Sequence, residues 1–307
     1  MIMWLSLAFV SAFLLGFYDV CKKKSLRNNA VIPVLCLNTL ICSLIFLPFI
    51  VLTATGHISS ESIFYTPTHG WAVQKYIVLK SCIVLSSWIF GYFGIKHLPI
   101  TIVGPINATR PVLSLVGALL IFGERLNFLQ WIGVLLAILS IYLLSLNGKK
   151  EGIDFKSNKW VIFVVLSAVL GALSGLYDKF LMAPVESGGV GLPRMEVQSW
   201  YNLYQFVLML FVLLFLWYPT HKRTTPFHWN WYIIFISIFL SAADFAYFYS
   251  LSMEGAMIAV VSMARRSSVV VSFLVGAMVF HEKNLKMKAI DLALILLGMF
   301  FLWLGTS

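Results

Sequence analysis

Long uncharged runs dominate the chain, and short clusters of charged residues separate them. Ten of these runs are long enough to cross a hydrocarbon core, which takes roughly 20 apolar residues in a helix. They lie near residues 3–21, 31–54, 74–95, 99–122, 127–147, 160–181, 197–219, 230–252, 256–280 and 288–306. The runs lack the alternation of apolar and polar positions found in membrane strands. The pattern therefore predicts an all-α polytopic membrane protein with ten transmembrane helices.

The runs recur as a set of five. "GFYDVCKK" at Gly16–Lys23 resembles "GLYDKF" at Gly175–Phe180, each near the end of the first helix of its half. "SLVGALLIFGERL" at Ser114–Leu126 resembles "SFLVGAMVFHEKN" at Ser272–Asn284, each closing the fourth helix. Because five is odd, the second half would enter the membrane in the opposite orientation. We therefore expect two inverted five-helix repeats, residues 1–150 and 151–307, as in many alternating-access transporters.

These residues also resemble a known family. An apolar helix ending in Gly-Glu-Arg-Leu, followed by a span opening "QWIGVLLAILSIYLLSL", is similar to the EamA-type transporters of the drug/metabolite transporter superfamily. The resemblance covers essentially the whole chain, as two EamA-like repeats. It implies a ten-helix transporter and leaves the substrate open.

Composition agrees with a membrane setting. Of 307 residues, 60% are hydrophobic and only 11% are charged, too few to cover a soluble protein of this size. The net charge of +10 does not indicate nucleic-acid binding, because most Lys and Arg residues sit in short clusters between the runs. The first run precedes its basic cluster, the reverse of a signal peptide, so it should stay in the membrane. We expect a multi-pass protein of a bacterial inner (plasma) membrane.

Orientation and assembly are left open by the sequence. Loops one, three, five, seven and nine hold most of the loop Lys and Arg residues. The positive-inside rule would place these loops in the cytoplasm and both termini outside. The family resemblance implies both termini inside. Nothing in the sequence indicates the oligomeric state.

Five basic residues lie within or at the ends of spans: Lys80, Arg110, Lys179, Arg265 and Arg266. The three arginines are near mid-helix, where an unpaired arginine costs at least about 2.5–3.5 kcal/mol on insertion scales and normally faces a cavity or the protein interior. Aligning Pro99 with Gly255 puts Arg110 opposite Arg266, whereas aligning Glu124 with Glu282 needs two more residues in the second half.

Acidic residues are scarcer at this depth. Asp244 is the one carboxylate well inside a span, and Asp19 and Asp178 lie at helix ends beside lysines. An anionic substrate would complete the charge balance, because a guanidinium binds carboxylate or phosphate in bidentate fashion. The alternative is a structural ion network. Asp244 is also the candidate for proton coupling, which an anion exchanger would not need.

The resemblance adds one expectation about the arginines. Plastid phosphate-sugar translocators of the superfamily carry an adjacent Lys-Arg pair in the ninth helix that holds phosphate, and Arg265 and Arg266 occupy a similar place. The fourth-helix lysine of that branch does not carry over, and the nearest position is Asn107. Further substrate-binding candidates, for several of which packing is the alternative, are Lys80, Asn38, Trp88, Tyr201, Asn202, Gln205 and Tyr247.

Other classes of function are less consistent with the sequence. No HExxH motif occurs, and the histidines lack metal-ligand spacing. We therefore expect no enzyme, no metal and no cofactor, with a membrane-embedded enzyme as a remote alternative. An exporter of amino acids or amphipathic drugs, or a flippase for a lipid-linked anionic carrier, remains open. A cation exporter should place acids at midplane, where this chain has arginines.

Overall fold

The structure is a computed structural model that describes residues 2–113, 116, 127–150, 152–155, 157–253, 258–280, 282 and 284–305. In these ranges the regular elements are all helical, which confirms the all-α prediction. The helices are α1 (Ile2–Ser25), α2 (Val31–Ala54), α3 (Trp71–His97), α4 (Ile100–Ala108), α6 (Phe128–Lys150), α7 (Lys159–Met182), α8 (Arg194–Val212), α9 (Tyr232–Leu251), α10 (Ile258–Arg266), α11 (Ser268–Phe280) and α12 (Leu285–Leu304). A π-helical stretch, Leu213–Trp217, and a 3-10 stretch, Tyr218–Arg223, extend α8, and Val185–Ser187 forms a short 3-10 turn.

Nine helical segments in the described ranges are long and apolar enough to span a membrane. Each coincides with one of the ten expected spans. The remaining expected span, 99–122, begins with α4, resumes as helix after a turn at Thr109 to residue 113, and then lies largely outside the described residues. The polytopic membrane architecture is therefore confirmed. Glu124 and Gly255, which anchor the two repeat alignments, also lie outside the described residues.

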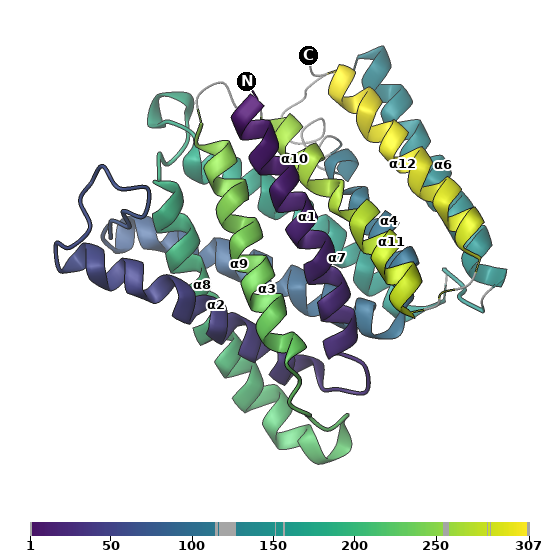
Figure 1. The fold of residues 1–307 in the computed structure, drawn as a ribbon, viewed down its shortest axis with the longest axis horizontal. Helices are drawn as coiled ribbons and strands as arrows, with labels where there is room; N and C mark the ends of the chain where they lie inside the picture. Colours follow the sequence, from purple (N-terminus) through teal and green to yellow (C-terminus); the bar gives the residue numbers. More distant parts are fainter. Residues whose placement is uncertain are drawn as a thin grey trace.

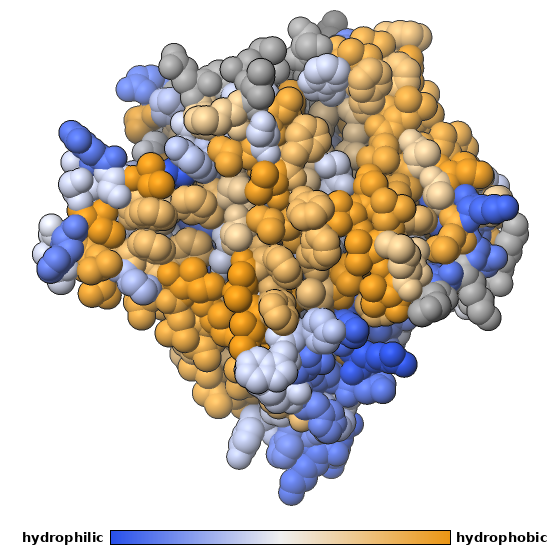
Figure 2. All heavy atoms as spheres, in the orientation of Figure 1, coloured by the Kyte–Doolittle hydropathy of each residue, from blue (hydrophilic) through white to orange (hydrophobic). Residues whose placement is uncertain are grey.

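The surface fits a lipid environment. Figure 2 shows hydrophobic residues over most of the visible face and hydrophilic residues at its margins. Large apolar side chains such as Phe215, which is 70% exposed, and Met278, which is 69% exposed, point out of the helices. Contiguous apolar surface of this kind would be unfavourable in water and is normal against acyl chains.

The helices of the two halves interlock. In Figure 1, α1 runs through the middle of the molecule, packed against α9, α10 and α11. The pairing across the halves is reciprocal: α1 packs on α9 and α3 on α7, while α2 packs on α8, α4 on α11 and α6 on α12. Two units related by a two-fold axis pair in this way. The division near residue 150 and the inverted orientation stay predictions.

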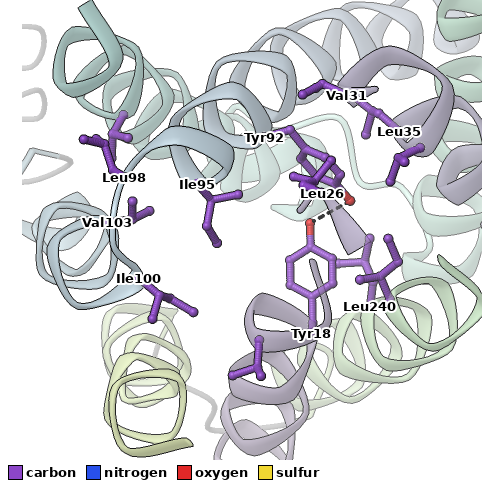
Figure 3. Packing of buried hydrophobic residues seen from close by; sticks show 14 of the residues in the cluster. Tyr18, Leu26, Val31, Leu35, Tyr92, Ile95, Leu98, Ile100, Val103 and Leu240 are labelled. Carbon is purple, nitrogen blue, oxygen red and sulfur yellow. Dashed lines mark hydrogen bonds between the residues drawn. The ribbon is translucent and has the colours of Figure 1, made fainter. Parts of the chain in front are cut away.

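Two tyrosines meet within a cluster of buried apolar side chains. The Tyr18 hydroxyl of α1 donates to the Tyr92 hydroxyl of α3 at 3.4 Å, among the apolar side chains of Leu26, Leu35 and Leu240 (Figure 3). All five residues are buried. This packing fixes the C-terminal half of α1 against α3 and α9.

Several lysines assigned to loops lie in helices, which corrects the sequence analysis. Lys22, Lys23 and Lys24 form the last turn of α1. The Lys23 ammonium donates to the carbonyl oxygens of Ile95, at 2.6 Å, and Leu98, where α3 ends. A cation is stabilised there by the unpaired carbonyls of a helix C-terminus. Lys23 therefore joins α1 to α3. Its role is not limited to that of a solvent-exposed charge that sets the orientation of the protein in the membrane.

Candidate functional site: a charged cavity between the two halves

A cavity of about 160 Å³ lies between α1, α3 and α4 on one side and α7 to α11 on the other. Both halves of the chain therefore contribute to its wall. Nine of the twelve residues expected at a binding or coupling site line it, namely Lys80, Trp88, Asn107, Arg110, Tyr201, Asp244, Tyr247, Arg265 and Arg266.

Two helices are interrupted at this cavity, and both interruptions have the same geometry. After α4, the Thr109 amide and hydroxyl both donate to the Ile106 carbonyl, at 3.2 and 2.7 Å. After α10, the Ser267 amide and hydroxyl both donate to the Ala264 carbonyl, at 3.1 and 2.6 Å. A hydroxyl that competes with the backbone in this way tightens the turn and bends the helix. Discontinuous helices of this kind form the sites of many transporters.

The interruptions favour one of the two repeat alignments. Matching Thr109 with Ser267 gives the same register as matching Glu124 with Glu282. In that register Arg110 lies opposite Ser268 and not opposite Arg266. The two arginines nevertheless reach one cavity, because each stands next to its interruption, Arg266 just before and Arg110 just after it.

Three acids in the wall each hold one basic side chain, in the pairs Lys22–Asp19, Lys80–Asp178 and Arg265–Asp244. The Lys22 ammonium lies 2.6 Å from Asp19, one turn away on the same helix. The Lys80–Asp178 pair instead joins α3 to α7, and both side chains are almost fully buried. Sequence reasoning placed Asp19 and Asp178 at helix ends, away from the arginines. The "YD" dipeptide shared by the two halves was the signal that could have paired them with the site.

The two adjacent arginines have different surroundings. The Arg265 guanidinium donates to Asp244 and lies 4.1 Å from the centre of the Tyr247 ring. The Tyr201 hydroxyl donates to the other oxygen of Asp244 at 2.6 Å. Arg265 is therefore neutralised and fixed in place. For the side chain of Arg266, by contrast, the described residues provide no hydrogen bond and no carboxylate within 4.0 Å.

Arg110 also lacks a carboxylate partner in the described part of the chain. Its guanidinium donates to Asn107 at 2.9 Å and to the Ser167 hydroxyl at 3.3 Å. Its other side rests on Gly171, where an added Cβ would be 2.5 Å from Arg110 Cζ. A Gly171-x-x-x-Gly175 pattern in a membrane helix usually indicates close helix packing. The structure shows instead that the missing side chain makes room for the arginine.

Three amides expected at the pocket lie elsewhere, which corrects that expectation. Asn38, Asn202 and Gln205 are buried but do not line the cavity. Asn38 accepts from the Ser237 hydroxyl at 2.9 Å, and Asn202 donates to the backbone carbonyl of its own helix at Gln198. The reason is that Asn38 lies where α2 packs on α9, which carries Ser237, whereas the Asn202 amide bonds within α8.

Comparison with known proteins supports the fold and finds a family match for residues 2–146. No curated protein matches the chain. A solved structure titled "Crystal structure of protein" is similar over 97% of this chain and 96% of its own, with a TM-score of 0.64 and 15% identity, which shows a shared fold. The model of the EamA-like transporter family matches residues 2–146. The resemblance read from the signature residues is thereby confirmed over residues 2–146, which match the EamA-like transporter family.

Proposed function

We propose that this membrane transporter is a secondary active carrier of a small anionic metabolite that bears a carboxylate or phosphate group. The observation that carries the proposal is the charge of the cavity wall, which has five basic side chains and three acids. Among the described residues, Arg110 and Arg266 are left without an acid. Two guanidinium groups beside one cavity are the arrangement that binds carboxylate or phosphate through paired hydrogen bonds.

The position of the two arginines suits alternating access. Arg110 comes from the first half and Arg266 from the second, each beside a helix interruption. An anion between them would contact both halves and would remain bound while one half rocks against the other. Asp244 is held by Arg265 and Tyr201, so a role in proton coupling would require that this pair opens. We place the carrier in a bacterial inner membrane.

The cavity argues against the other transport candidates. An exporter of amphipathic cations should present a surplus of acids, and this wall has a surplus of bases. A flippase for a lipid-linked anion would bind the same kind of anionic headgroup. Only an experiment can therefore distinguish a flippase from a carrier of small anions. A phosphate monoester would stabilise a flippase only when a polyprenyl chain is attached to the ester.

Binding can be measured as an increase in melting temperature of the protein purified in detergent. We expect phosphate esters or dicarboxylates at millimolar concentration to raise it, since a ligand of the folded state stabilises by mass action. Arg266→Gln should abolish the increase, because it removes one of the two unpaired guanidiniums. Arg223→Gln, at an exposed position outside the cavity, is the matched control and should respond like the unmodified protein.

Two results would count against this proposal. One is stabilisation by organic cations alone. The other is stabilisation by an anion to the same extent in Arg110→Gln, Arg266→Gln and the control. Either result would give the arginines a structural role.

A pair of glycine substitutions tests the packing of the Arg110 guanidinium against α7. Gly171→Ala would push a methyl group into the guanidinium and should weaken anion binding at least about tenfold, the range of 1.4 kcal/mol or more. Gly175→Ala, one turn further along α7, has no atom within 4 Å of the added Cβ and should bind nearly normally. Both changes gain the same helix propensity, so that effect cancels. Equal affinities of the two variants, measured by ligand-dependent melting, would show that Arg110 does not contact the anion.

A further inference from the structure

We infer that the transported anion carries two negative charges, and that Asp244 sets this number by neutralising Arg265. The inference rests on the proposed function, because it names the charge of the substrate in the same cavity. It follows from which basic side chains are already satisfied and which are not.

Both lysines in the cavity wall are already paired with carboxylates of the protein. The Lys80 ammonium is paired with Asp178 and lies 5.0 and 5.5 Å from the centres of the Tyr201 and Phe248 rings. Lys80 is only 2% exposed. An ammonium with a carboxylate on one side and ring faces on the others gains little from a further anion.

Lys22, which also lines the cavity, has the same kind of cage. Besides Asp19, its ammonium lies 4.3 Å from the centre of the Tyr18 ring and 5.3 Å from that of Tyr92. Together with the Arg265–Asp244 pair, three of the five basic groups are therefore neutralised within the protein. The two guanidiniums of Arg110 and Arg266 are left for the substrate.

The two guanidiniums give the cavity a surplus of two positive charges. This surplus fixes the charge of the ligand, because the protein cannot adjust it. An arginine does not lose its proton in proteins, so neither group can become neutral to suit a less charged ligand. In a cavity of low dielectric, an uncompensated charge is expensive. A monoanion would leave one positive charge, and a trianion would leave one negative charge. A dianion leaves none.

A substitution of Asp244 would change the number of positive charges that the protein leaves for the ligand. One carboxylate oxygen of Asp244 neutralises Arg265, and the other accepts a hydrogen bond from the Tyr201 hydroxyl. Asp244→Asn would keep an oxygen for the tyrosine and release the charge of Arg265. The surplus would then be three. Arg110→Gln would lower it to one.

The test uses ligands of similar shape and different charge. Succinamide, succinamate and succinate carry zero, one and two negative charges, and dimethyl phosphate and methyl phosphate carry one and two at pH 8, above the second phosphate pKa of about 6. Each is titrated against the melting temperature of the purified protein. We expect the doubly charged member of at least one series to bind at least tenfold more tightly than its singly charged analogue. Arg110→Gln should remove this preference and favour the singly charged analogue instead. Asp244→Asn should shift it toward the trianion tricarballylate.

The outcomes separate the two proposals. If succinamate binds as tightly as succinate, and dimethyl phosphate as tightly as methyl phosphate, the inference about valence is wrong while the anion site stands. If succinamide binds equally well, or no member of either series binds, the proposed anion carrier is wrong as well. If Asp244→Asn does not fold, the loss of preference in Arg110→Gln decides, and an unchanged preference there overturns the inference.

Discussion

Replacing Lys80 by methionine is expected to lower the free energy of unfolding by about 3–5 kcal/mol, because it leaves the buried carboxylate of Asp178 without its partner. The pair lies between α3 and α7, so the loss also loosens the contact between the two halves. The free energy can be measured by titrating the protein in mixed micelles with dodecyl sulfate while following its helical circular dichroism.

Two further variants complete this experiment. Lys75→Met is the matched control, since Lys75 lies on the same helix and is exposed. It should change the free energy of unfolding by less than about 1 kcal/mol. The double variant Lys80→Met/Asp178→Leu should recover most of the loss, because replacing a whole buried pair by apolar side chains is often nearly neutral. A single Lys80→Met variant as stable as the control would show that the pair is solvated.

Replacing Glu282 by alanine should lower the free energy of unfolding by about 2–3 kcal/mol, through the loss of charge-assisted hydrogen bonds at a helix N-terminus. The carboxylate of Glu282 accepts from the amides of Ile100 and Thr101, at 2.7 and 3.1 Å, and from the Thr101 hydroxyl. These are among the first residues of α4, the helix that carries Asn107 toward the cavity. Anion-dependent stabilisation should therefore weaken together with the fold.

Glu282→Gln and Glu186→Ala serve as comparisons. Glutamine keeps an oxygen acceptor without the charge, so it should lose about half as much stability as alanine. Glu186 is exposed and makes no such cap, so its replacement should have little effect. The same dodecyl sulfate titration measures all three. If Glu282→Ala and Glu186→Ala behaved alike, the cap would contribute nothing to the stability of α4.

The sequence by itself determined the architecture and pointed to the arginines. Apolar runs of spanning length must become helices in lipid, because no water is present to satisfy their backbone groups. This physical constraint acts locally, so it can be read from residue type and run length. The same constraint singled out Arg110, Arg265 and Arg266, since a charge deep in the membrane must face the protein interior. All three line the cavity.

The tertiary structure alone decided how the charges are partnered. Sequence spacing treats Arg265 and Arg266 as equivalent neighbours, yet consecutive residues of a helix point in directions about 100° apart. Only the placement of α9 decides that Arg265 meets Asp244 while Arg266 faces the cavity. Likewise, the pairing of Lys80 with Asp178 depends on the depth and rotation of α3 against α7. These are set by side-chain packing between helices far apart in the sequence, which no local pattern records.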